Sequence, residues 1–315
     1  MASRSFVSRL RDGDEIARLA TFLCAASVVL ITVLLVFELW RQSALPRHKF
    51  GFSFFLTRVW DPIAEQFGAL PFIYGTLVTA AVALIIAVPL GIGAAIFLAE
   101  LAPLRLSDPL QFLIDLLAAV PSVIYGFLGF FVVVPLMREW IEPALKKSLG
   151  FLPLFQGPAY GVGFLTAGMV LAIMVIPYII SVSREVLLSV PRDQREAALA
   201  LGATRWESTW KVVVPFARAG IMGSIFLALA RALGETMAVT MVIGNTPTIS
   251  ASLFSSGYSI AAVIANEFTE ATGDLYLQSL IELGLVLFLL TFILNGLARL
   301  MMLLTTRRGT GMGNA

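Results

Sequence analysis

The chain contains very few of the residues on which most catalytic and metal-binding sites depend. Its 315 residues include one cysteine, Cys24, and one histidine, His48. A single cysteine cannot close an internal disulfide, and one histidine cannot build a histidine-rich metal cluster. We therefore predict no metal site and no cofactor, and we expect Cys24, which lies inside an apolar run, to fill space.

Two sequence motifs of common enzymes are absent as well. The chain has no G-x-x-x-x-G-K-[ST] loop, which cradles nucleotide phosphates, and no G-x-S-x-G elbow, which presents a nucleophilic serine. We therefore do not expect the chain to be an enzyme that hydrolyses ATP by that route or acts as a serine hydrolase. Any process driven by ATP would need a separate partner subunit.

Charge is scarce along the whole chain. Charged residues make up 13% of the sequence and hydrophobic residues 58%, whereas soluble domains carry about 25% charged residues. A net charge of +2 gives no sign of a nucleic-acid partner. Four charge-free stretches each exceed the roughly 20 residues that a membrane-spanning helix needs; they are residues 66–99, 116–137, 148–183 and 236–266.

This pattern predicts an all-α membrane protein with six transmembrane helices. Their predicted limits are residues 19–40, 72–99, 110–137, 161–183, 219–244 and 276–304. The first span has an apolar core about twice as long as that of a signal peptide, and no A-x-A-like cleavage site follows it. We therefore expect residues 19–40 to stay as an anchor, with short segments before and after the bundle, 1–18 and 305–315.

The basic residues predict the orientation of the six spans. If both termini are cytoplasmic, the segments on that side hold about twice as many lysines and arginines as the opposite side. The predicted outer loop 245–274 has neither lysine nor arginine, and it carries Glu267, Glu270 and Asp274. We therefore predict that both termini lie in the cytoplasm.

Two ionisable residues, Arg231 and Glu235, lie in the middle of the fifth predicted span. Each costs roughly 2.5–3.5 kcal/mol to insert at mid-membrane. On a continuous helix, residues four apart share a face, so each could offset the charge of the other. The same face carries the small residues Gly220, Ser224 and Ala228, which would let another backbone or a solute approach. We expect a polar solute to be handled here; the alternative is a purely structural ion pair.

The segment 184–218, between the fourth and fifth spans, has a pattern of its own. Residues 191–201 read as a short helix, because Pro191 suits its first turn and Asp193 complements its dipole. Gly202 would end this helix, and a second helical segment, 204–214, would follow. The pattern predicts a helix–turn–helix at the membrane surface, which either packs on its own bundle or docks into the groove of a partner.

This segment resembles the EAA loop of bacterial ABC-importer permeases. The likeness rests on Glu196, Ala197 and Ala198, on Gly202 four residues further on, and on Pro215 after a valine-rich stretch. Two more stretches, RALGETMAV at 231–239 and AAVPSVIYGFLG at 118–129, resemble the PstC-type permease subunits of phosphate importers. That likeness covers essentially the whole chain.

The resemblance implies a MetI-like permease bundle, spanning 72–304 and including the EAA loop 184–218 as a cytoplasmic coupling helix. It implies that Glu196, Ala197, Ala198 and Gly202 dock onto an ATP-binding subunit, and that Arg231 and Glu235 serve the phosphate pathway. The implied partners are a PstA-type permease, two ATP-binding subunits, a periplasmic or extracellular phosphate-binding protein, the phosphate ion and membrane lipid. The implied location is the bacterial inner membrane.

Other interpretations stay open at this stage. An arginine suits sulfate or molybdate as well as it suits phosphate, because all are oxyanions. A passive channel or a scaffold would need Arg231 and Glu235 only as a structural pair. The EAA-type pattern favours the transporter, because a channel has no use for a docking segment.

Overall fold

The computed structural model describes residues 14–310. Their regular structure is helical, joined by loops, and one isolated β-bridge links Asp61 and Gln66. In chain order the helices are α2 (Asp14–Gln42), α3 (Ala44–Phe50), α4 (Leu70–Ile96), α5 (Leu104–Ala118), α6 (Ser122–Leu128), α7 (Val134–Leu136), α8 (Glu142–Leu149), α9 (Phe164–Leu188), α10 (Arg192–Ala200), α11 (Arg205–Ser208), α12 (Val214–Gly234), α13 (Met237–Thr240), α14 (Ile260–Glu267) and α15 (Asp274–Thr310). Six helical stretches in this part of the chain are long and apolar enough to cross a membrane. The predicted all-α, six-span class is therefore confirmed. Of the predicted terminal segments, 1–18 and 305–315, residues 14–18 belong to α2 and residues 305–310 to α15, and the rest lie outside the described residues.

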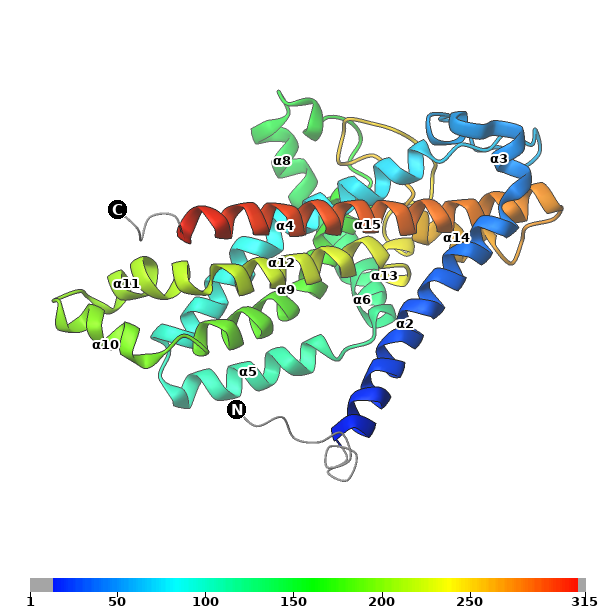
Figure 1. Cartoon of the computed structure of the whole chain (residues 1–315). Helices are drawn as coiled ribbons and strands as arrows, with labels where there is room; N and C mark the ends of the chain where they lie inside the picture. The colour runs from blue at the N-terminus through cyan, green and yellow to red at the C-terminus, as the bar shows by residue number, and fades with distance from the viewer. Residues whose placement is uncertain (1–13, 311–315) are drawn as a thin grey trace.

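Helix α9 forms the centre of the bundle. In its most apolar window 67% of the residues are buried, whereas the corresponding share for α2 is 0%. Helix α4 lies directly against α9, because a Cβ atom on Gly168 would come within 2.4 Å of Val82. Helix α2 instead runs diagonally beside the bundle (Figure 1). The close approach of α4 and α9 therefore depends on small residues, as is usual where helices pack in membranes.

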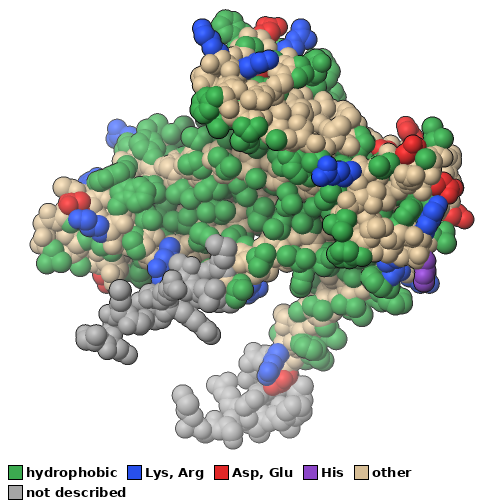
Figure 2. Space-filling view, turned by 90° about the horizontal axis from the view of Figure 1, so that it is seen from above, with side chains coloured by type: hydrophobic (Ala, Val, Ile, Leu, Met, Phe, Trp, Pro, Cys, Tyr) green, Lys and Arg blue, Asp and Glu red, His purple; other side chains and the backbone are tan. Residues whose placement is uncertain are grey.

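The surface between the two ends of the molecule is apolar. In Figure 2 hydrophobic side chains cover most of the middle of the visible face, and charged side chains gather toward its edges. Helices α10 and α11 project at one end, and α3 and α14 lie at the opposite end (Figure 1). This distribution fits a bundle whose sides face lipid or another membrane subunit.

The third span lies further along the chain than the predicted 110–137. Helix α5 ends at Ala118, and the membrane-length helical stretch is Ser122–Leu149, which runs from α6 to α8. Pro121 separates α5 from α6 with an extended backbone (φ −58°, ψ 139°). Proline has no backbone N–H to donate, and it disfavours helical geometry in the residue before it. The proline therefore ends one helix and starts another, whereas the predicted span 110–137 ran through it.

The fifth span also differs from the predicted 219–244, at both ends. It begins at Arg205, where Thr204 and Glu207 form a capping box, and it ends at Gly234. The predicted second surface helix, 204–214, is therefore the first part of the spanning helix itself. Beyond Gly234, Glu235 has an extended backbone (φ −72°, ψ 127°), and the short helix α13 follows. The assumption of one continuous helix through Gly244 was wrong.

Candidate functional sites

The two interrupted helices meet inside the bundle. Helix α6, which follows the break at Pro121, packs against α13, which follows the break at Glu235. The contact is close, because a Cβ atom on Gly126 would lie 2.5 Å from the sulfur of Met241 and 3.2 Å from the Cα of Ala238. The fold thus brings together the stretches 118–129 and 231–239, which lie far apart in the sequence.

Arg231 lies beside this meeting point, near the end of α12. Its guanidinium carbon is 4.3 Å from the centroid of the Tyr178 ring, on α9. Its Nε is buried, and no described residue accepts a hydrogen bond from it. A cation over an aromatic face is stabilised by the ring quadrupole, which leaves the N–H donors of the guanidinium free for another group. Arg231 is therefore held in place while keeping its capacity to bind an anion.

Two tyrosines near Arg231 donate hydrogen bonds to backbone carbonyl groups at the end of α5. The Tyr178 hydroxyl donates to the carbonyl oxygen of Ala118 at 2.7 Å, and the Tyr125 hydroxyl donates to that of Leu117 at 2.7 Å. The last carbonyl groups of a helix have no partner within the helix. Because Tyr178 touches both Ala118 and Arg231, it joins the break after α5 to the end of α12.

Glu235 does not pair with Arg231. It lies outside the helix that carries Arg231, and no ion pair joins the two side chains within residues 14–310. Its Oε1 instead accepts a hydrogen bond from the backbone N–H of Ala238 at 3.4 Å. The prediction that Arg231 and Glu235 share one helix face was therefore wrong. The break at Gly234 turns Glu235 toward the start of α13.

The small-residue face of α12 packs against α9. The hydroxyls of Ser224 and Ser183 are 2.7 Å apart, and a Cβ atom on Gly220 would come within 2.3 Å of Val186. Ser224 and Ala228 are buried. The small residues were expected to let either a solute or a neighbouring helix come close. The structure supports the close approach of a neighbouring helix, α9.

The predicted surface helix is present as α10, with Pro191 at its N-cap position. Glu196 and Ala197 are exposed, and Ala198 is half-buried. Leu201, which follows α10, is 90% exposed. Gly202 has a left-handed backbone (φ 89°), and a Cβ atom there would meet nothing within 4 Å. A glycine suits this turn because other residues reach such a φ only with strain, and the turn leaves a large apolar side chain in the open.

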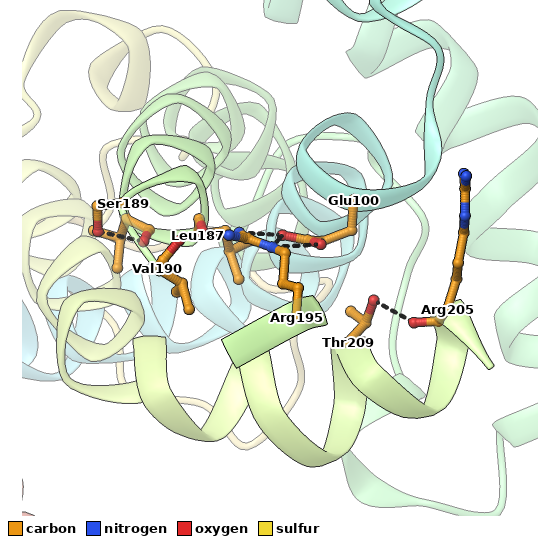
Figure 3. A network of polar contacts seen from close by, with 8 residues as sticks. Glu100, Leu187, Ser189, Val190, Arg195, Arg205 and Thr209 are labelled. Atoms are coloured by element: carbon orange, nitrogen blue, oxygen red, sulfur yellow. Dashed lines mark hydrogen bonds and ion pairs between the residues drawn. The ribbon is translucent and has the colours of Figure 1, made fainter. Parts of the chain in front are cut away.

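Arg195 fastens α10 to the bundle (Figure 3). Its Nη2 is 2.7 Å from Oε1 of Glu100, and its Nε is 3.2 Å from both oxygens of that carboxylate. It also donates to the carbonyl oxygens of Val190 and Leu187, near the end of α9. Glu100 follows α4, and its side chain is only 9% exposed. Helix α10 is therefore attached to the ends of both α4 and α9 through one side chain.

The sequence did not assign roles to Tyr178, Tyr125, Glu100 or Arg195. The position of Glu100 at the end of a spanning helix could have been noticed in the sequence, because it is the first charged residue after the charge-free stretch 66–99. The tyrosines carried none, since their contacts depend on where α5 stops. Within residues 14–310, no group of three histidine, cysteine, aspartate or glutamate side chains is placed to hold a metal ion.

Comparison with known sequences gives consistent matches. The model of the family "Binding-protein-dependent transport system inner membrane component" matches residues 87–302. The chain is 49% identical to a phosphate transport system permease protein PstC of Mesorhizobium japonicum, over 88% of this chain and 87% of that protein. It is 50% identical to PstC of Haemophilus influenzae, over 91% and 92%. A probable PstC of Methanocaldococcus jannaschii is 40% identical, also over 91% and 92%.

Solved structures with a similar fold share little sequence with this chain. A chain of a bacterial ABC transporter involved in importing the acidic polysaccharide alginate gives a TM-score of 0.59 at 16% identity, covering 92% of this chain and 98% of that one. A chain of the inward-facing MetNI methionine ABC transporter gives 0.52 at 17% identity, covering 76% and 98%. Both likenesses concern the fold, and they confirm the predicted ABC-importer permease bundle.

Proposed function

Because the chain belongs to the binding-protein-dependent transport system inner membrane components, and among them to the PstC-type permeases, we propose that it carries inorganic phosphate across the membrane as one permease subunit of an ATP-driven importer. It is a multi-pass inner membrane transport component and not an enzyme. The names of its relatives support phosphate over sulfate or molybdate, which the charge of Arg231 alone would not distinguish.

The substrate pathway passes Arg231 in this proposal. The observation that carries it is a guanidinium with a buried, unpartnered Nε beside the meeting of two interrupted helices. A structural cation inside a membrane would be expected to pair with an acid, and Arg231 stacks on Tyr178 instead. Glu235 lies close in the sequence and lowers the positive potential around the site, so that phosphate passes without being trapped.

The coupling to ATP takes place at α10 and the turn after it. Glu196, Ala197, Ala198 and Gly202 form the contact with an ATP-binding subunit, and the exposed Leu201 adds an apolar anchor. Solvent-exposed large apolar side chains at a projecting turn are typical of a docking surface. The complete importer then contains a PstA-type permease that supplies the other half of the pathway, two ATP-binding subunits and a periplasmic phosphate-binding protein. Both termini of this chain face the cytoplasm.

The proposal is tested by phosphate uptake in cells whose own copy of this chain is deleted. Arg231→Gln should abolish uptake of radiolabelled phosphate while the protein remains in the membrane. Arg218→Gln is the matched control, because Arg218 is an arginine at the other end of the same helix, and it should leave most uptake intact. Normal phosphate uptake by Arg231→Gln, or uptake of sulfate rather than phosphate by the unmodified protein, would overturn the proposal.

A further inference from the structure

A cavity of about 270 Å³ lies between α15 and the chain that leads from α2 to the turn after α3. Its lining is mostly apolar but includes one arginine and one glutamate; the lining residues that matter here are Trp40, Arg47, Phe52, Phe55, Glu282 and Leu289. Helix α3, which contributes Arg47 to the lining, lies at the end of the molecule opposite α10 and α11 (Figure 1). It shares no lining residue with the proposed pathway or the coupling helix.

Glu282 is a buried acid without a partner. It is 2% exposed, its Oε2 is fully enclosed, and no described residue donates a hydrogen bond to either carboxylate oxygen. A buried carboxylate with no donor is costly, because it loses its hydration without compensation. The proposed transport function does not use Glu282. Because no described residue donates a hydrogen bond to its carboxylate, a donor would have to come from a molecule bound in the cavity.

Arg47 lines the same cavity, and other groups hold its guanidinium in place. Its Nε donates to the carbonyl oxygen of Ser43 at 3.1 Å, and its Nη2 donates to that of Trp40. Its guanidinium carbon lies 3.6 Å from the centroid of the Trp40 ring. These contacts hold the cation in place, and no ion pair joins it to Glu282 in residues 14–310. One cavity therefore presents a fixed cation and an unpartnered acid that do not touch each other.

We propose that this cavity binds the headgroup of a zwitterionic phospholipid with a primary amine, phosphatidylethanolamine. Its ammonium group has three donors and no acceptor, which matches the carboxylate of Glu282 through Oε1, the oxygen that is not fully enclosed. Its phosphate matches the guanidinium of Arg47. Tryptophan and arginine are typical of the membrane–water interface, where such headgroups lie. The acyl chains extend along exposed apolar side chains at the rim, including Phe52 and Leu289, which are 76% and 46% exposed.

The choice of phosphatidylethanolamine over phosphatidylcholine follows from hydrogen bonding. Both lipids carry the same phosphate and the same net charge, but the trimethylated nitrogen of choline has no N–H to donate. A carboxylate that is enclosed in protein therefore discriminates between them through the missing hydrogen bonds. A charge-assisted hydrogen bond of this kind corresponds to a preference of about tenfold or more.

The test is native mass spectrometry of the full chain in mild detergent, titrated with either lipid of matched acyl chains. The unmodified protein should bind phosphatidylethanolamine about tenfold more tightly than phosphatidylcholine. Glu282→Gln keeps the size of the side chain and removes its charge, so it should bring the two affinities together. Arg47→Gln should weaken both lipids, because the phosphate is common to them.

The control variant is Glu38→Gln. Glu38 lies on α2, two residues before Trp40, but does not line the cavity. It pairs with Arg41 at 2.6 Å, so its carboxylate is already satisfied, and this variant should keep the full preference. Equal affinity of the unmodified protein for both lipids would overturn the proposal. So would a preference that survives in Glu282→Gln, which would show that Glu282 is only a neutral buried acid.

Discussion

The aromatic ring of Tyr178 holds the guanidinium of Arg231 in position. Tyr178 supports the guanidinium from one side and is itself tied to the carbonyl oxygen of Ala118. Cation–π contacts are worth about 0.5–1 kcal/mol at exposed sites and about 2 kcal/mol when desolvated. An acidic side chain in place of the ring would neutralise the positive charge of Arg231 in an ion pair. The ring leaves that charge available to attract an oxyanion. The arrangement suits a site that binds an anion weakly and briefly.

We predict that Tyr178→Leu lowers phosphate uptake about tenfold, because the support of Arg231 is worth roughly 1–2 kcal/mol. Tyr178→Phe retains the ring and loses only the hydroxyl, so it should keep most of the activity. The measurement is initial uptake rate at equal amounts of protein in the membrane. Equal rates for both variants would mean that the ring does not position Arg231.

Exchanging the two ionisable residues tests whether Arg231 and Glu235 form a structural pair. The double variant Arg231→Glu with Glu235→Arg keeps both charges but moves the cation out of α12 and away from Tyr178. Because the two side chains are not paired, we predict that uptake stays abolished in the double variant. Restored uptake in the same assay would support the structural-pair interpretation and count against the pathway proposal.

Two of the longer helices, α5 and α12, are each interrupted and followed by a short helix. Helix α5 stops before Pro121 and α12 stops at Gly234, and each is followed by a short helix that packs against the other. Interrupted helices expose backbone polar groups, which a membrane protein tolerates only where the protein or a water-filled passage satisfies them. The two breaks therefore mark a polar region inside the bundle, in agreement with the proposed pathway at Arg231.

Arg195 attaches helix α10 to the bundle through its ion pair with Glu100 and its hydrogen bonds to the carbonyl oxygens of Val190 and Leu187. We predict that Glu100→Gln loosens this attachment, because a hydrogen bond to a charged group contributes about 1.5–3 kcal/mol. Amide hydrogens of residues 192–202 should then exchange about tenfold faster or more, measured by mass spectrometry. Glu185→Gln is the matched control, since Glu185 is an exposed glutamate on α9. Unchanged exchange in Glu100→Gln would show that other contacts hold α10.

Gly202 offers a second test of the same surface. Its left-handed backbone makes valine unfavourable by about 1–2 kcal/mol, so Gly202→Val should distort the turn and uncouple the permease from its ATPase. Gly93→Val is the control, because a Cβ atom there also meets nothing within 4 Å and its φ is ordinary. We expect co-purification with the ATP-binding subunit to be lost only for Gly202→Val. Retained co-purification together with normal uptake would exclude the turn as the coupling contact.

For the whole molecule, the orientation of the six spans remains a prediction from the basic residues. We expect a cysteine at Thr272 to react with an impermeant thiol reagent added outside intact cells, and a cysteine at Arg192 to remain unlabelled. Both positions are exposed. Arg192 begins α10 and Thr272 lies between α14 and α15, and α10 and α14 lie at opposite ends of the molecule (Figure 1). The background is Cys24→Ser, which removes the only native cysteine. The reverse labelling pattern would invert the orientation.

The class of the protein could be predicted from the sequence alone, because long apolar stretches can cross a membrane only as helices or in a closed barrel. Six spans, the all-α bundle and the family resemblance followed from composition and from the motifs at 118–129, 191–202 and 231–239. The turn at Gly202 was also predictable, since a glycine after a short amphipathic helix commonly adopts a left-handed backbone.

The relation between Arg231 and Glu235 could not be predicted from the sequence, because it depends on where α12 ends. Spacing of four residues predicts a shared face on a continuous helix, but Gly234 ends α12 and places Glu235 on another element. The partners of Arg231 and Arg195, Tyr178 and Glu100, are distant in sequence and come close only when α4, α9, α10 and α12 pack. Local periodicity carries no information about such contacts, because they depend on where each helix stops and on which neighbour it meets.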